Sequence, residues 1–197
     1  HPVAGTREQV PARRTSGAAR ALRGTQGGIG NGRMTFGAII EGGHWLPTTK
    51  SDPRVVSMYL RHYSAAKNAR GSEYAYRKTR YQSGVGGVGE SMALVTLDGQ
   101  AVFLWLNNTV ERYDKQHGVV CTIFRNEGSL LSSTLVSEAD EIAWQRWPDE
   151  SPHFTYVEDS KVASVNPGYC FKKAGWETAG RNKDGRLTIL ERVKMYE

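Results

Sequence analysis

The middle of the chain is organised in short apolar runs separated by polar turns, which is the pattern of a sheet. Residues 91–96 and 101–107 are two such runs, and the Asp-Gly pair in 97–100 between them is typical of a tight hairpin turn. Residues 119–124 form a third run of the same kind. The pattern therefore predicts three consecutive strands, of which the first two form a hairpin.

Two segments place their apolar residues at the spacing of a helix. In residues 132–147 the apolar positions recur every three or four residues. They are Leu135, Val136, Ala139, Ile142, Ala143 and Trp144. Ser132 or Ser133 can cap this helix, and a proline follows it. A shorter helix is predicted within 55–66, after a Ser-Asp-Pro start signal.

The C-terminal part adds further strands to this plan. A fourth strand is predicted at 154–157, a short helix or turn at 166–175, and a closing hairpin from 176–178 and 187–193. This order of elements predicts an α/β (α+β) fold with a mixed central sheet flanked by helices. Residues 34–197 are expected to form one domain, which is long enough to bury a sizeable core.

Positive charge is concentrated at the N-terminal end of the chain, whose formal net charge is +6. Residues 1–33 carry six arginines against one glutamate, and 54–81 carry seven basic residues against one acidic residue, whereas 82–197 carry 12 basic and 16 acidic residues. The asymmetry indicates a polyanion partner. Residues 1–33 are rich in small and polar residues and are predicted to be a disordered basic tail, for which a solvated leader without a specific role is the alternative.

Tyrosines lie among the basic residues of 54–81. Tyrosine rings can stack on unpaired bases while the cations neutralise phosphates, so this segment is predicted to contact a nucleic acid. The candidate contact residues, which the resemblance described below assigns to DNA binding, are Arg61, Lys67, Arg70, Tyr74, Tyr76, Arg77, Lys78 and Arg80. The glycine-rich stretch 83–89 resembles a phosphate loop only superficially, because no strand precedes it and no Lys-Ser/Thr pair follows it. It is predicted to be a flexible loop.

Several classes of protein are not expected from this composition. The apolar runs are too short to span a bilayer, and the first residues lack the layout of a secretory signal. The two cysteines, Cys121 and Cys170, provide neither a disulfide framework nor a four-ligand zinc set. Both are expected to be packing residues of a protein in a reducing cytosol. No metal is expected at the site.

Short motifs in the second half of the chain resemble a known family. The order of elements and the ending 171–176 are similar to the C-terminal half of the GCN5-related acyltransferases. The strings Ile-Phe-Arg-Asn-Glu, Arg-Trp-Pro and Thr-Tyr-Val resemble the Mom family of phage DNA-modification proteins, as does Asn-Pro-Gly-Tyr-Cys-Phe-Lys-Lys-Ala-Gly-Trp at 166–176. The resemblance covers residues 55–193 and is strongest over 119–178.

The resemblance implies a DNA-hypermodification enzyme that converts adenine to N6-carbamoylmethyladenine in double-stranded DNA. Such an enzyme protects phage DNA from host restriction and acts in the host cytoplasm. An enzyme that works on adenine usually flips the base out of the duplex. Two alternatives stay open: a conventional acetyl-CoA-dependent N-acetyltransferase acting on an amine, and a non-catalytic DNA-binding protein.

The resemblance also implies a donor site near the third strand and the following helix. The candidate cofactor-binding residues are Arg125, Asn126, Ser132, Ser133 and Asn166. The loop lacks the glycine fingerprint that cradles the pyrophosphate of coenzyme A, and Phe171 stands where many acetyltransferases have a tyrosine that protonates the leaving thiolate. A carbamoylmethyl group on N6, counted with that nitrogen, has the atoms of glycine amide. The donor is therefore either a coenzyme A thioester such as acetyl-CoA or glycyl-tRNA, and tRNA becomes a partner in the second case.

The candidate catalytic residues are Arg125, Asp159, Tyr169, His62 and Tyr63. Arg125 can hold a phosphate or carboxylate, or form a salt bridge with Glu127 or Asp159. Asp159 can accept a proton from the adenine amine, or be a solvated loop residue. Tyr169 can donate a proton, stack on the base or pack in the core. The His62–Tyr63 pair can act as a base, a metal ligand or a stacking pair.

Overall fold

The computed structural model describes residues 42–67, 85–87, 89–108, 112, 114–162 and 164–195, without the side chains of 66 and 67. The predicted tail at 1–33 lies outside these residues, as do seven of the eight candidate DNA contacts, counting the side chain of Lys67. In the described part of the chain, no helix is both long and apolar enough to cross a membrane.

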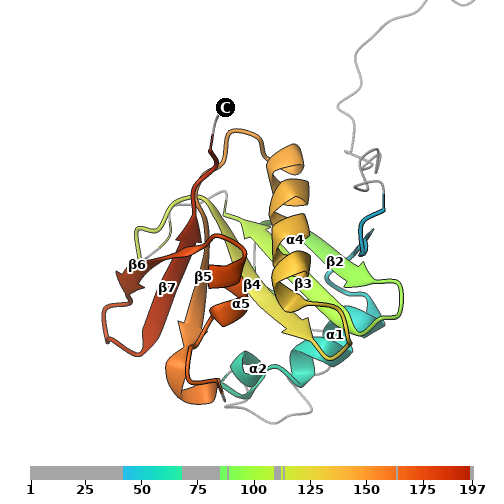
Figure 1. The fold of residues 1–197 in the computed structure, drawn as a ribbon, viewed down its shortest axis with the longest axis horizontal. Helices are drawn as coiled ribbons and strands as arrows, with labels where there is room; N and C mark the ends of the chain where they lie inside the picture. Colours follow the sequence, from blue (N-terminus) through green and yellow to red (C-terminus); the bar gives the residue numbers. More distant parts are fainter. Residues whose placement is uncertain are drawn as a thin grey trace, which may run out of the picture. The chain divides into compact units, whose positions relative to one another are not determined.

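Seven strands form one mixed sheet in the order β1-β2-β3-β4-β5-β7-β6 (Figure 1). Only β4 and β5 run parallel, and every other neighbouring pair is antiparallel. The strands are β1 (Trp45–Thr48), β2 (Glu90–Thr96), β3 (Ala101–Asn107), β4 (Val119–Asn126), β5 (His153–Glu158), β6 (Glu177–Arg181) and β7 (Leu187–Arg192). The predicted mixed sheet is confirmed. The sequence pattern misses β1, which is short and contains Pro47.

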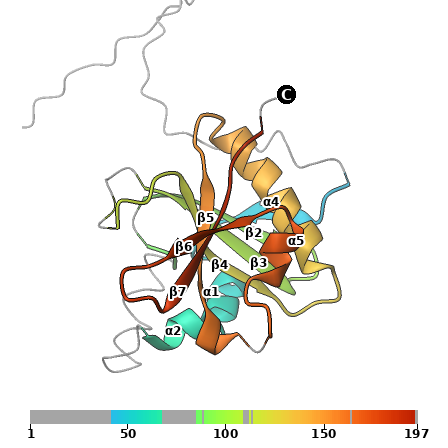
Figure 2. The ribbon, with the colours of Figure 1, turned by 60° about the vertical axis from the view of Figure 1, so that its left-hand side comes forward.

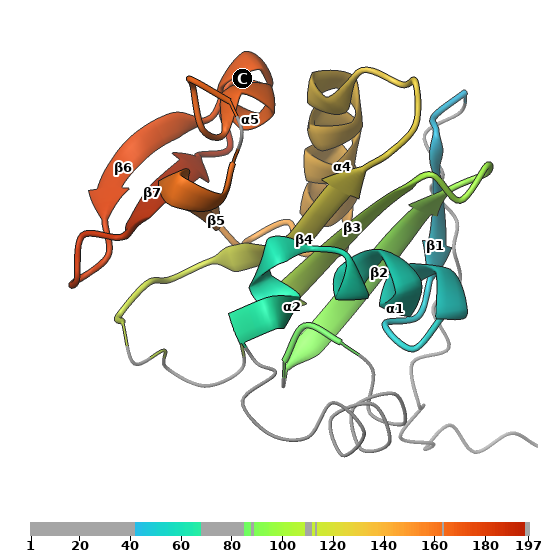
Figure 3. The ribbon, with the colours of Figure 1, turned by 90° about the horizontal axis from the view of Figure 1, so that it is seen from below.

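Helices cover both faces of the sheet. The pair α1 (Pro53–Leu60) and α2 (Tyr63–Lys67) lies on one face, and α4 (Ser132–Arg146) lies on the other, as Figure 3 shows. The short α5 (Tyr169–Lys173) packs beside α4 (Figures 1 and 2), and a single 3-10 turn, η1 (Asp159–Lys161), follows β5. The helix predicted within 55–66 is thus two helices with a break between them.

The core on the α4 face is unusually aromatic. Phe103 and Trp105 of β3 are fully buried there, against Phe171 of α5 and Trp176. Alternate residues of β3, such as Leu104, are buried against α1 on the other face. β3 is therefore covered on both faces, which explains why its sequence is a continuous apolar run and not an alternating one.

β4 contains a β-bulge close to the point where it separates from β5. The β3–β4 register pairs Leu104 with Ile123 but Trp105 with Cys121, so Thr122 is an extra residue in β4. The parallel pairing of β4 with β5 ends at Cys121 and Thr155. Beyond this point the two strands separate, and their facing backbone edges are not paired with each other.

The start of α4 differs from the prediction. Leu131 occupies the N-cap position, where no side chain bonds to the first turn. Ser132 accepts a hydrogen bond from Asn126 Nδ2 at 3.0 Å. Neither Ser132 nor Ser133 caps the helix, because both already lie within its first turn.

Candidate active-site cavity

A cavity of about 670 Å³ lies where β4 and β5 separate. Its walls are β4, β5, the N-terminal part of α5 and the junction between α1 and α2. The junction contributes His62 and Tyr63, and β4 contributes the segment from Val120 to Asn126. Phe171 and Cys170 close it on the α5 side. The bulge in β4 is thus the local feature that opens the site.

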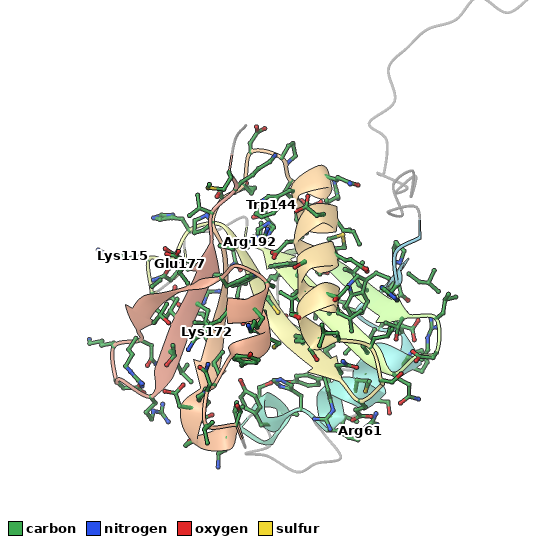
Figure 4. The ribbon with its side chains drawn as sticks, in the orientation of Figure 1. Arg61, Lys115, Trp144, Lys172, Glu177 and Arg192 are labelled. Atoms are coloured by element: carbon green, nitrogen blue, oxygen red, sulfur yellow. The ribbon has the colours of Figure 1, made fainter. Side chains whose placement is uncertain are left out.

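Arg125 lies in the cavity wall, and its guanidinium is already engaged. Its Nε donates to Glu127 Oε1 at 2.5 Å, and its Nη1 donates to the carbonyl of Arg61 at 2.8 Å. Glu127 also accepts from Arg61, from Nε at 2.9 Å and from Nη2 at 2.7 Å. The two guanidinium groups lower the pKa of Glu127 to about 2. The salt bridge left open as an alternative for Arg125 is therefore present, and it ties β4 to the end of α1, where Figure 4 labels Arg61.

His62 and Tyr63 face the cavity as a pair of rings, with centroids 4.3 Å apart. Burial, assisted by the nearby charge of Arg125, lowers the pKa of His62 to about 4. The ring is consequently neutral at physiological pH. Burial raises the pKa of Tyr63, whose hydroxyl donates to the carbonyl of Tyr156 at 3.5 Å.

A second charged group in the wall comes from residues that the sequence analysis did not select. Arg112 lies over the rings of Phe154 and Tyr156, at 5.4 and 5.7 Å from their centroids, and bonds to Asp114 at 2.9 Å. The hydroxyl of Tyr156 donates to the same carboxylate. Burial and this hydrogen bond raise the pKa of Tyr156 to about 12. Arg112 precedes β4 in a polar loop, and no sequence motif marks it.

The lining carries cations but no anions within the described residues. Arg112, Arg125 and Lys161 line the cavity, and no aspartate or glutamate of the described chain does. Lys161 makes no ion pair with any described residue. It is the lining cation most available to an anionic ligand.

Two of the candidate catalytic residues, Asp159 and Tyr169, lie outside this cavity. Asp159 begins η1 and turns toward β7, where it accepts hydrogen bonds from Thr188 at 2.9 Å and from Arg181 at 2.7 Å, which lower its pKa. Tyr169 is 51 % exposed at the start of α5, and the ammonium of Lys173 lies 5.6 Å from its ring. The grouping of Arg125, Asp159 and Tyr169 in one cavity is therefore not what the fold produces. The 3-10 turn η1 directs Asp159 away from the cavity, and Tyr169, at the first position of α5, faces solvent.

Of the four remaining predicted donor-site residues, two line the cavity and two lie outside it. Asn166 accepts from Lys172 Nζ at 2.9 Å and lies outside the cavity, as does Ser133. Ser132 lines it. Asn126 also lines it, but its amide donates to the Leu130 carbonyl at 2.7 Å and accepts from Gly128 N at 2.9 Å. Asn126 thus braces the loop before α4.

Both cysteines line the cavity as thiols. Cys121 is buried in β4, as predicted for a packing residue, and Cys170 is partly buried in α5. Burial raises the pKa of each thiol. Protonated thiols in these positions are poor nucleophiles and contribute mainly to the shape of the wall.

No family model matches this sequence, and no curated protein matches it. Among solved structures, the chain is similar to aminoglycoside 6'-acetyltransferase type Ii, with 10% identity over 78% of this chain and 98% of that chain and a TM-score of 0.50. It is also similar to aminoglycoside acetyltransferase AAC(6')-Ib in complex with coenzyme A and kanamycin (14%, 77% and 94%, TM-score 0.46) and to Escherichia coli ElaA (16%, 75% and 97%, TM-score 0.45).

The likeness to the first of these structures shows the fold. The seven-stranded mixed sheet flanked by helices is the fold of the GCN5-related N-acetyltransferases, as predicted. The resemblance to the Mom family stays a prediction from the sequence.

Proposed function

We propose that the protein is an acyltransferase-type enzyme that modifies an amine of an anionic substrate, the N6 amine of adenine in DNA. The observation that carries the proposal is the cavity between β4 and β5, with three lining cations and no carboxylate among its described residues. A large cavity with convergent polar groups is the default position for an active site.

The charge of the cavity favours DNA over the substrates of the similar enzymes. Aminoglycosides carry several ammonium groups, and a site for them needs carboxylates in its wall. Here no described carboxylate lines the wall, and Lys161 adds a positive charge without an ion pair to a described residue. Phosphates are attracted by it, and the basic residues of 54–81, together with the net charge of +6, add to the same preference. A conventional acetyltransferase of polycationic amines is therefore the weaker candidate.

Two features suit a donor that contains phosphate and amide groups. The helix α4 has 15 residues and no side-chain cap, and its first residue, Ser132, lines the cavity, so that free N–H groups can hold a phosphate. The unpaired edge of β4 beyond Cys121 can bond to an extended chain of amides. A coenzyme A thioester has both parts. Glycyl-tRNA, the other donor considered, offers phosphates without the amide chain.

The proposed product can be formed with balanced chemistry from a glycyl donor. The N6 amine attacks the glycyl carbonyl, a C–N bond forms, and the bond from the carbonyl to the donor's sulfur or oxygen breaks. The free amine of the glycyl group then attacks C6 of the ring. The original C6–N6 bond breaks, and N6 becomes the terminal amide of a carbamoylmethyl group. An acetyl donor stops after the first step, at N6-acetyladenine.

Mass spectrometry of nucleosides from DNA co-expressed with the protein tests the proposal. We expect an adenosine heavier by the carbamoylmethyl group, reduced by about tenfold or more in Lys161→Ala, because a charge-assisted contact to phosphate is lost. Arg186→Ala is the matched control, since this exposed cation in the β6–β7 turn does not line the cavity. Unaltered nucleosides with salt-dependent DNA binding would instead establish a non-catalytic binding protein.

Purified protein with one donor at a time identifies the donor. Modified DNA with a glycyl thioester of coenzyme A and none with charged tRNA supports the thioester, and the reverse supports glycyl-tRNA. Acetylation of free amines without any change in DNA would establish the conventional acetyltransferase.

A further inference from the structure

We propose that His62 donates a hydrogen bond from Nε2 to the carbonyl oxygen of the reacting acyl group, and that it does not act as a general base. This inference rests on the proposed acyl transfer and assigns a role to one residue of the same cavity. It differs from the sequence analysis, in which His62 was a candidate base, metal ligand or stacking residue.

The hydrogen bonds of His62 determine where its proton lies. The backbone N–H of Ser64 points to Nδ1 at 3.3 Å, and the Ser64 hydroxyl lies 2.8 Å from the same atom. A backbone N–H can only donate, so Nδ1 is the acceptor and carries no proton. In a neutral imidazole the proton then resides on Nε2.

The Nε2 edge is left for a ligand. His62 lines the cavity, and Nε2 has no hydrogen-bond partner among the described residues, nor is it one of the fully enclosed unpartnered atoms. It is therefore an N–H donor open to the cavity. A general base would need a free lone pair at this position, and the lone pair of this imidazole is occupied by Ser64.

Neighbouring groups keep the ring neutral and in place. The guanidinium of Arg125 disfavours a second positive charge on His62, and burial acts in the same direction. Arg125 is held by Glu127 and by the carbonyl of Arg61, the residue directly before His62. Arg125, Glu127 and Ser64 are thus positioning residues for His62. The Tyr63 ring lies beside the imidazole, with centroids 4.3 Å apart and the ring planes tilted by 32°.

A neutral N–H donor suits acyl transfer. When the amine attacks, the C–N bond forms and the carbonyl oxygen gains negative charge, which an N–H group directed at it stabilises. The oxygen returns to a carbonyl as the bond to the leaving group breaks. The amine proton leaves to the departing sulfur or oxygen or to solvent, and His62 keeps its own proton throughout.

Nitrogen-15 NMR of the full-length protein, without ligand, tests the protonation state directly. We expect a proton on Nε2 and none on Nδ1 of His62 at neutral pH, and a shift of its pKa from about 4 toward the ordinary value in Arg125→Met. A proton on Nδ1, or an imidazolium at neutral pH, overturns the inference. Arg186→Met, which removes a cation away from the cavity, should leave the His62 signals unchanged.

Kinetics on the modified nucleoside test the role in the reaction. Replacing His62 by Leu should lower kcat by about 10²–10³, as for removal of one oxyanion donor. His62→Gln, whose amide nitrogen can reach the Nε2 position, should retain at least a tenth of the wild-type kcat. Equal loss in both variants, or none in His62→Leu, overturns the role. A wild-type protein that transfers no acyl group from any donor refutes the proposed function, and the NMR result separates that failure from a wrong tautomer.

Discussion

Two clusters in this molecule combine a carboxylate, an arginine and a histidine, and they differ in burial. In the first, Asp140 of α4 is fully enclosed and accepts hydrogen bonds from His153 Nδ1 at 2.7 Å, Trp176 Nε1 at 2.8 Å and Arg192 Nη1 at 2.9 Å. Figure 4 shows Arg192 beside Trp144, whose ring its guanidinium covers at 5.0 Å. This buried cluster joins α4, β5 and β7, and it does not line the cavity.

The second cluster is at the rim of the cavity. Glu127 bonds to Arg61 and Arg125, all three are partly exposed, and His62 lies in the wall beside them. The same residue types therefore serve two purposes. An enclosed carboxylate whose partners are all supplied by the protein stabilises the fold, whereas a partly exposed pair beside a cavity sets the charge and protonation of groups that meet a ligand.

The largest expected difference between the clusters is in stability. Replacing Asp140 by Ala leaves the charge of Arg192 and two buried N–H donors without their partner, and we expect a loss of about 3–5 kcal/mol of unfolding free energy. Urea denaturation measures it. Glu127→Ala, the matched variant in the rim cluster, should lose much less, because water screens its partners. Equal losses would contradict the distinction between the clusters.

The next expected effect is a dependence of stability on pH, which His62 beside the rim cluster should cause. Since the pKa of His62 falls from about 6.5 in the unfolded chain to about 4 in the folded protein, only the unfolded state takes up a proton between these values. Stability should therefore be full above about pH 6.5 and decline as the pH drops toward about 4, by up to about 1.4 kcal/mol per unit.

The contribution of His62 is obtained by comparing urea unfolding of the wild type with His62→Gln across this range. In the variant, the free energy of unfolding should no longer show the part of its pH dependence that protonation of His62 causes. The carboxyl groups of Glu127 and Asp114, whose pKa values are lowered to about 2, contribute only at lower pH. Identical slopes in the two proteins would show that folding does not lower the pKa of His62.

A smaller effect is expected at the uncapped start of α4. Leu131 is extended at the N-cap and 69 % exposed, so Leu131→Asp can bond to the first turn and should add about 1 kcal/mol of stability. The same carboxylate would compete with a donor phosphate, and the KM for the donor should rise. Thermal unfolding and donor titration measure the two effects. Greater stability with an unchanged KM would place the phosphate elsewhere.

The smallest expected change is in the salt dependence of DNA binding, and it concerns the lining cation without an ion pair in the described chain. Lys161→Ala should reduce the slope of log K against log salt for DNA binding by about 1, because one phosphate contact is lost. Filter binding or fluorescence anisotropy at several salt concentrations measures the slope. A slope equal to that of wild type would show that Lys161 does not reach DNA phosphates.

The sequence predicted the architecture better than the site. Periodicity located β2, β3, β4, α4 and β5 within about two residues of their positions, because burial of one or both faces leaves a regular trace in the chain. Of the candidate catalytic residues that it selected, Arg125, His62 and Tyr63 line one cavity. It did not anticipate Arg112 or Lys161, which are ordinary polar residues of loops and turns.

The order and type of most elements, and with them the class of fold, were determined by the local pattern of apolar residues. Which side chains share the cavity was decided only by the tertiary structure. A one-residue bulge at Thr122 separates two strands, and a single turn directs Asp159 to β7 while Lys161 faces the cavity. The position of a bulge and the direction of a turn follow from packing between segments far apart in the chain, and no local pattern of residues encodes them.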